Sequence, residues 1–192
     1  MKTDAKNFIL ASGSVHRLAL LKTIGYEPKK VVSANIDESE QLHESPLVFV
    51  KRMAREKALK AAEDFPQENI LSADTVVVVR GKILHKSQNA QEQTKVMEDL
   101  SGKTHKVITS VCLRAKDGRL LQRTVMTRVI MKKMSEREIK EYVDSNEWVG
   151  VVGYSIEGRL GAYVKKIIGS YSGVVGLPLF ETKNLLTGAG VL

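Results

Sequence analysis

An aspartate stands inside one of the most apolar stretches of this sequence. Asp74 lies in Ser72-Ala73-Asp74-Thr75, within the run Ile70–Val79 (ILSADTVVVV). Burying a carboxylate costs much free energy unless the group is paired, hydrogen-bonded or bound to a metal. Asp74 is therefore either a satisfied aspartate at a strand end or bulge, or a carboxylate that orients water or binds Mg²⁺. The apolar surroundings favour the second interpretation.

A turn of small residues near the N-terminus has the composition of an anion site. Ser12-Gly13-Ser14 stands between an apolar run and a helical pattern, and Arg17 follows one turn into that helix. Backbone N–H groups at a helix N-terminus, two hydroxyls and a glycine together make an anion cradle. The same tripeptide is also a common cap and turn, and the spacing of a P-loop is missing. Both interpretations stay open at this point.

Two lysines and an acidic pair complete the candidate set. Lys57 falls in a predicted helix, and Lys86 follows a predicted hairpin. A reaction at a polyphosphate needs several positive groups, although a single lysine is more often a solvated surface residue. Asp37-Glu38 follows a predicted strand, and it either supplies a second oxygen ligand for Mg²⁺ or belongs to a solvated acidic loop.

Nitrogen or sulfur ligation of a metal is not predicted. The chain has one cysteine, Cys112, and its four histidines show no zinc spacing. Cys112 lies in an apolar alternation and is expected to be buried, and the lack of a disulfide favours a reducing compartment. The N-terminal apolar run is too short for a signal peptide, and no stretch is long enough to span a membrane. We therefore expect a cytoplasmic protein.

Hydrophobic periodicity and turn residues predict the elements that position these groups. The predicted strands cover residues 7–11, 30–34, 70–79, 83–84, 105–115, 119–131, 149–154 and 161–168. The predicted helices cover residues 15–25, 46–65, 88–100, 135–143 and 178–186. Ser45-Pro46 and the capping box Ser135/Glu138 are strong helix starts. Gly169–Pro178 is either a tight connection or a second lining of the cleft, opposite the Ser12-Gly13-Ser14 turn.

Length and composition bound the class of protein. The 192 residues, 43% hydrophobic and 27% charged, suit a single folded domain over residues 1–192 and exclude disorder, collagen repeats and coiled coils. Because helices and strands interleave with at least one hairpin, the predicted class is mixed α/β. Thirty Lys and Arg against 22 Asp and Glu give a net charge of +8. That charge suggests an anionic partner without identifying it.

Taken together, these segments resemble the Maf family of nucleotide pyrophosphatases, once described as septum-formation inhibitors. The matching pieces occur in order over nearly the whole chain. They are Ile9–Ser14 (ILASGS), Ile36-Asp37-Glu38, Arg55–Ala58 (REKA), Ser72–Val77 (SADTVV), Ser101–His105 (SGKTH) and Gly169–Pro178 (GSYSGVVGLP).

The resemblance implies a fold, a cofactor and a reaction. The fold would be a mixed sheet, similar to that of the inosine triphosphatases, with two lobes around a central cleft. The reaction would be hydrolysis of a nucleoside triphosphate to the monophosphate and pyrophosphate, with Mg²⁺ or another divalent cation, often in a homodimer. Carried over by position, the substrate-binding residues would be Ser12, Gly13, Ser14, Arg17, Thr75 and Glu157. The catalytic residues would be Asp74, as general base or water-orienting group, with Lys57 and Lys86, and the metal ligands would be Glu38 and Asp74.

The chain departs from the family pattern at four places. Val15-His16-Arg17 stands where a proline and two basic residues are usual, and Lys86-Ser87-Gln88-Asn89 keeps the lysine but loses an acidic end. The segment Val149–Tyr154 lacks both of the charges that the family carries there. Finally, Glu157 replaces a glutamine.

The last departure leaves the preferred base open. A glutamine amide both donates and accepts, which suits uracil or thymine, whereas a carboxylate only accepts, which suits guanine. A branch of the family acting on 7-methyl-GTP is similar in carrying Glu-Gly at this position. Ile156 and residues 169–175 are more similar to the branch acting on dTTP and UTP. The prediction is therefore a dTTP/UTP or modified-nucleotide pyrophosphatase, with a 7-methyl-GTP pyrophosphatase as the alternative.

Two other classes of protein compete with the enzyme. The lost charges in Val149–Gly153 would suit a catalytically weak nucleotide-binding regulator of cell division, but the intact Asp74, Lys57 and Lys86 argue against it. The net charge would suit a nucleic-acid-binding protein, but the few aromatic residues show no stacking pattern. We expect a nucleoside triphosphate as the partner, and neither nucleic acid nor a membrane.

Overall fold

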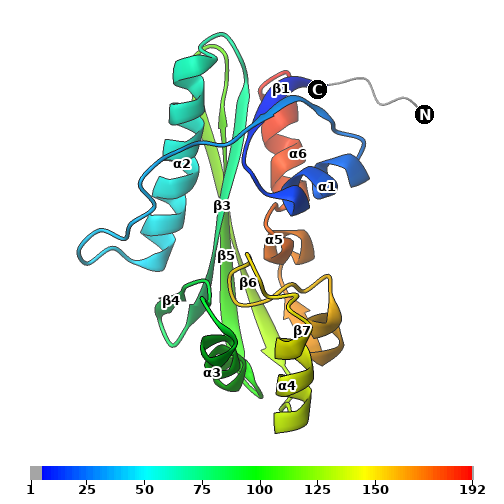
Figure 1. The fold of residues 1–192 in the computed structure, drawn as a ribbon. Helices are drawn as coiled ribbons and strands as arrows, with labels where there is room; N and C mark the ends of the chain where they lie inside the picture. Colours follow the sequence, from blue (N-terminus) through cyan, green and yellow to red (C-terminus); the bar gives the residue numbers. More distant parts are fainter. Residues whose placement is uncertain (1–5, 192) are drawn as a thin grey trace.

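The computed structural model describes residues 6–191, which form one seven-stranded mixed sheet with helices on both faces (Figure 1). The mixed α/β class predicted from the sequence is confirmed. Residues 1–5, the start of the stretch in which no signal segment was predicted, and residue 192 lie outside this description.

The strands are β1 (Lys6–Ala11), β2 (Pro28–Val32), β3 (Ile70–Val79), β4 (Lys82–Leu84), β5 (Thr104–Arg114), β6 (Leu120–Met131) and β7 (Val164–Ile168). The helices are α1 (Val15–Thr23), α2 (Pro46–Asp64), α3 (Ala90–Leu100), α4 (Glu136–Asp144), α5 (Tyr171–Val175) and α6 (Leu179–Gly188), with a 3₁₀ helix at Arg159–Tyr163. The strand order is β2-β1-β3-β5-β6-β7, and β4 pairs with β3. The β1 pairings are parallel, and the others are antiparallel.

Strand β3 lies at the centre of the sheet and changes its partner midway along one edge. The ladder with β1 ends at the pair Ala11–Ser72, and the ladder with β4 begins at the pair Val77–Leu84. Asp74 lies between these two ladders, just beyond the carboxyl end of β1. In α/β sheets, ligand crevices form where neighbouring strands part at their carboxyl ends. The topology therefore opens the sheet beside the aspartate that the sequence singled out.

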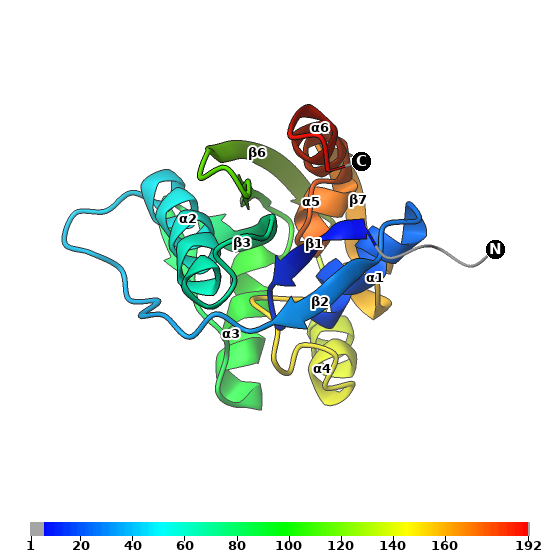
Figure 2. The ribbon, with the colours of Figure 1, turned by 90° about the horizontal axis from the view of Figure 1, so that it is seen from above.

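Helix α2 covers one face of the sheet, and α1, α5 and α6 lie on the other (Figure 2). The α2 face is buried by small and aliphatic side chains, among them Val50, Met53, Ala54 and Ala58. The alanines let the helix approach the strands closely, so that its polar side chains can reach the open edge of β3.

The opposite face carries two separate cores. Leu71 and Ala73 of β3 pack with α1 and α6, whereas Val77 of the same strand packs with α3 and α4. Between the two cores the face is polar, because Thr75 and its β5 neighbour Thr109 lie there, 3.0 Å apart. This division gives the two lobes that the family resemblance implies.

Helix starts agree with the predicted caps. Ser45 caps α2 with Pro46 at its first position, and Ser135 and Glu138 form a complete capping box on α4. Cys112 is buried as expected, and burial raises the pKa of its thiol to about 11. Within residues 6–191, no helix combines the length and apolarity needed to cross a bilayer.

The predicted strand over 149–154 is wrong. This segment forms turns and bends, in which Gly150 and Gly153 have φ angles of 80° and 72°. The valines between these glycines predict a strand, but the left-handed backbone at the two glycines interrupts the extended conformation. The strand predicted over 161–168 begins only at Val164, after the 3₁₀ helix, and the Gly169–Pro178 loop contains the unpredicted short helix α5.

A buried histidine of β5 contacts that irregular segment. His105 is 3% exposed, and its Nε2 lies 2.5 Å from the hydroxyl of Tyr154. Its Nδ1 has no hydrogen-bond partner within the described residues. Burial lowers the pKa of His105 to about 4, because the charged ring would be desolvated.

We predict that His105 makes the fold sensitive to acid. As the pH falls below the ordinary histidine pKa of 6.5, His105 becomes protonated in the unfolded chain but stays neutral in the folded chain. The free energy of unfolding therefore decreases until about pH 4. The shift corresponds to a loss of about 3 kcal/mol in the free energy of unfolding. Urea denaturation should show this loss in the wild type, with a smaller one in His105→Gln. The exposed control His85→Gln should behave as the wild type, and an unchanged acid loss in His105→Gln would contradict the assignment.

Candidate active site

A cavity of about 550 Å³ lies between the two lobes. All the residues predicted as site residues line it: Ser12, Gly13, Ser14, Arg17, Glu38, Lys57, Asp74, Thr75, Lys86 and Glu157. Asp37, the other member of the acidic pair, is not among the lining residues. The chain therefore brings together groups from six separate segments of the sequence.

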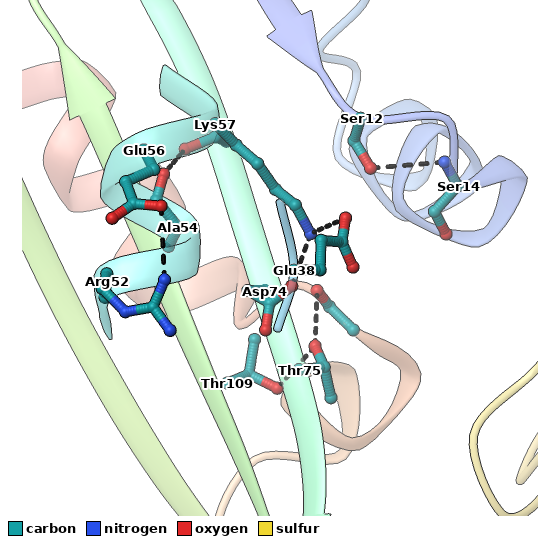
Figure 3. Close-up of polar contacts among 12 residues, drawn as sticks. Ser12, Ser14, Glu38, Arg52, Ala54, Glu56, Lys57, Asp74, Thr75 and Thr109 are labelled. Carbon is teal, nitrogen blue, oxygen red and sulfur yellow. Dashed lines mark hydrogen bonds and ion pairs between the residues drawn. The ribbon is translucent and has the colours of Figure 1, made fainter. Parts of the chain in front are cut away.

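Lys57 joins two carboxylates at one end of this cavity (Figure 3). Its Nζ lies 2.6 Å from Asp74 Oδ1 and 3.0 Å from Glu38 Oε1. Asp74 is only 7% exposed, and this burial raises its pKa, although Lys57 and Arg17 act in the opposite direction. The aspartate is thus satisfied by a partner and lines the cavity, but it lies within the regular β3–β5 ladder, opposite Ser110, and not at a strand end or bulge. Its role toward water or Mg²⁺ stays a prediction.

The register between α2 and β3 places Lys57 over Asp74. Ser72, which is fully buried, donates its hydroxyl to the Ala54 carbonyl at 2.5 Å. Ser72 lies two residues before Asp74 on the same face of β3, and Ala54 lies nearly one helical turn before Lys57. This bond therefore fixes the helix against the strand next to the ion pair. Sequence reasoning missed the role, although a serine in an apolar strand is a signal for such a bond.

Arg17 ties three segments together rather than pointing freely into the cavity. It donates to the Gly176 carbonyl at 2.8 Å, to Ser12 Oγ at 3.0 Å and to Thr75 Oγ1 at 3.2 Å. Burial lowers the pKa of its guanidinium, an effect that Asp74 and Glu38 oppose. The loop before α6 is thereby attached to α1 and β3, and it supplies a second lining of the cavity, as one of the two interpretations of residues 169–178 held.

The Ser12-Gly13-Ser14 turn acts as a cap in this structure. Ser14 Oγ accepts from the Arg17 backbone N–H at 3.4 Å, and Ser12 Oγ accepts from the Ser14 N–H at 3.2 Å. A Cβ on Gly13 would meet only Ser33 Oγ, at an ordinary 3.7 Å, so the protein by itself does not require glycine here. Binding of an anion by this turn stays a prediction.

A side-chain contact that was not predicted lies in another part of the cavity lining. His16 Nδ1 lies 2.8 Å from Glu157 Oε2, and both side chains are partly exposed. His16 stands where the family usually has a basic residue, and that substitution was the signal for its location. Lys86 is exposed at the same cavity. Much of the remaining wall is aliphatic, from Val77, Val107, Val149, Val151, Val152, Ile156, Val174 and Val175.

A divalent cation fits the carboxylate end only together with a ligand. Within the described chain, no cluster of three or more His, Cys, Asp or Glu side chains could hold a metal ion. Mg²⁺, however, is usually bound by one or two carboxylates together with substrate phosphates and waters. Glu38 and Asp74 are a donor set of that kind, and both already form ion pairs with the Lys57 ammonium.

The fold and the cavity define a class: a mixed α/β protein with a polar cleft between two lobes, where cationic and carboxylate side chains meet. The sequence model of the family described as "Maf-like protein" matches residues 7–189, and the chain belongs to this family.

Relatives cover nearly the whole chain. A dTTP/UTP pyrophosphatase of Agrobacterium fabrum is 40% identical over 99% of this chain and 95% of its own length. One of Hyphomonas neptunium is 45% identical over 95% of each chain. A nucleoside triphosphate pyrophosphatase of Ehrlichia ruminantium is 44% identical over 94% of this chain and 95% of its own.

We predict that Lys57→Met destabilises the protein through the charge it leaves unpaired. The free energy of unfolding should fall by about 3 kcal/mol at neutral pH, because Asp74 and Glu38 then face each other without their shared cation. The double variant Lys57→Met/Asp74→Asn should be more stable than Lys57→Met by about 1 kcal/mol. Urea denaturation without divalent cations measures both values.

A matched control is Lys60→Met on the same helix, whose solvent-exposed ion pair with Glu63 should contribute little to stability. Strictly additive effects of the Lys57 and Asp74 substitutions would show that the two side chains are not energetically coupled.

Proposed function

We propose that this protein hydrolyses nucleoside triphosphates, foremost dTTP and UTP, to the monophosphate and pyrophosphate, with Mg²⁺ or another divalent cation. The observation that carries the proposal is the Lys57–Asp74–Glu38 cluster, set in a cavity that Arg17 and Lys86 also line. The names of the relatives, dTTP/UTP pyrophosphatase and nucleoside triphosphate pyrophosphatase, support it.

The side chains of the cavity suit attack of water on the α-phosphorus. Asp74 orients the water and takes its proton as the new P–O bond forms, and the bond from the α-phosphorus to the bridging oxygen breaks to release pyrophosphate. Lys57 and Lys86 offset the charge that develops on the departing group. When bound at Glu38 and Asp74, a divalent cation would neutralise phosphate oxygens as a Lewis acid.

The charges of the cavity argue that a cation accompanies the nucleotide. The lining holds three cationic side chains, Arg17, Lys57 and Lys86, and three carboxylates, Glu38, Asp74 and Glu157. A triphosphate brought into such a balanced set would face uncompensated repulsion from the carboxylates. A divalent cation held by Glu38 and Asp74 would offset that repulsion.

The aliphatic part of the wall suits a nucleobase. Ligand pockets combine apolar walls with a few polar groups that give orientation, and Glu157 is the charged group among the valines and Ile156. Because the Glu157 carboxylate contacts His16, it is held in place for contact with a base. This carboxylate is the observation that favours the second candidate, a 7-methyl-GTP pyrophosphatase.

The compartment and the assembly belong to the same proposal. A single buried cysteine suits the reducing cytoplasm, where nucleoside triphosphates are present. We keep a homodimer as the expected assembly, and analytical ultracentrifugation tests it.

We predict that Asp74→Asn abolishes turnover while the fold persists. Pyrophosphate release should fall at least about 100-fold, the typical contribution of a general base. Phosphorus NMR identifies pyrophosphate, rather than phosphate, as the product, and circular dichroism reports the fold. Asp37→Asn, in the neighbouring loop and off the cavity, is the matched control and should keep wild-type rates. Near-wild-type release by Asp74→Asn would remove its assigned role.

We predict that residue 157 affects the choice of base. Parallel assays should give the wild type its highest kcat/KM on dTTP and UTP. Glu157→Gln should then raise the ratio of dTTP over 7-methyl-GTP turnover by about tenfold, the size of one hydrogen bond. A wild-type preference for 7-methyl-GTP would favour the second candidate. Identical ratios in wild type and Glu157→Gln would end the base-reading role.

A further inference from the structure

The carboxylate of Glu38 is delivered to the cavity by a segment without regular structure. Residues 33–45, between β2 and α2, form neither helix nor strand, and the Glu38 side chain is 58% exposed. Such a segment gives an exposed glutamate many accessible positions, each separated by little free energy. Glu38 nevertheless lies 3.0 Å from Lys57, so something must hold the loop against α2.

Arg52 of α2 supplies that hold. Its Nε donates to Glu44 Oε1 at 2.7 Å, and its Nη2 donates to Glu44 Oε2 at 2.6 Å. The same Nη2 donates to the Ser39 carbonyl at 2.9 Å. The Glu44 side chain is only 3% exposed, so this pair is largely shielded from water. We call Arg52, Glu44 and the Ser39 carbonyl the loop clamp.

The geometry of the clamp is specific to arginine. Two parallel N–H bonds to one carboxylate use the planar fork of the guanidinium, and a third bond in the same plane reaches the carbonyl. A lysine ammonium carries the same charge but cannot make the bidentate contact. The pairing with Glu44 raises the pKa of Arg52, so the clamp stays charged at any physiological pH.

The clamp acts directly beside Glu38. Ser39 is the next residue in the chain, so fixing its carbonyl restricts the backbone from which the Glu38 side chain extends. Arg52 and Lys57 belong to the same helix (Figure 3), so the clamp and the receiving ammonium move as one body. The clamp thereby sets the distance between Glu38 and the Lys57–Asp74 pair.

We infer that Arg52 is a positioning residue of the active site: through Glu44 and the Ser39 carbonyl it holds Glu38 at the cation-binding end of the cavity. The inference rests on the proposed function, because Glu38 is a cation ligand only there. Arg52 does not line the cavity, and its effect on the cation is exerted through the loop. Groups that orient metal ligands in this way typically affect metal affinity rather than chemistry.

The test compares Arg52→Lys and Glu44→Gln with the wild type. Two readouts are used: amide hydrogen exchange of residues 36–41, and Mn²⁺ binding by electron paramagnetic resonance with a non-hydrolysable α,β-imido nucleoside triphosphate. Lys51→Met is the matched control, because this neighbouring exposed lysine lies on the same helix and off the cavity.

Both variants should weaken Mn²⁺ binding roughly tenfold and accelerate exchange in the loop by a similar factor, whereas α2 amides keep their protection. The rate of pyrophosphate release at saturating cation should stay within about twofold of the wild type. Unchanged loop exchange and Mn²⁺ affinity would overturn the inference, as would equal loss of protection throughout α2, which indicates a purely structural role. A wild type that releases no pyrophosphate would overturn the proposed function. Amide hydrogen exchange of residues 36–41 would still show whether Arg52 holds the loop.

Discussion

The ion pair between Lys57 and Asp74 is the constraint on which much of this structure depends. A carboxylate in the middle of an apolar strand is tolerated only if a cation and hydrogen bonds compensate its desolvation. That requirement sets the register of α2 on β3, which the Ser72 hydroxyl secures through the Ala54 carbonyl. It also explains the small residues on the buried face of α2, because a close helix is needed to bring the ammonium within 2.6 Å of the aspartate.

The change of partner along β3 gives this ion pair access to a ligand. Because β1 ends before Asp74 and β4 begins after it, the sheet is open where the two lobes meet. Arg17 then ties the loop before α6 to this opening, and the loop clamp ties the segment before α2 to it. Two of the connecting segments beside the cavity are thus each held by one arginine to a regular element. Such preorganisation places charged groups before a substrate arrives.

The sequence predictions were most accurate where the predicted feature depends on residues that are close together in the sequence. Helix starts marked by Ser45-Pro46 and by Ser135 were placed within a residue, since a cap is a contact between near neighbours. The valine-rich run at 149–154 failed, because positive φ angles at two glycines outweigh a β-favouring composition. Most members of the cavity were singled out by residue type and spacing, and Thr75 and Glu157 were added by the family resemblance. No local signal pointed to Arg52 or to the pairing of His16.

The sequence by itself determined the residue types, most of the elements, the family and the list of groups that could carry chemistry. Periodicity, caps and motif order are properties of neighbouring residues, so they can be read before folding. Only the tertiary structure decided the partners: Arg17 with Gly176, 159 residues away, and His16 with Glu157, 141 residues away. Such contacts depend on how whole lobes pack and on where the sheet opens. No local pattern records that arrangement, because its free energy comes from the long-range packing itself.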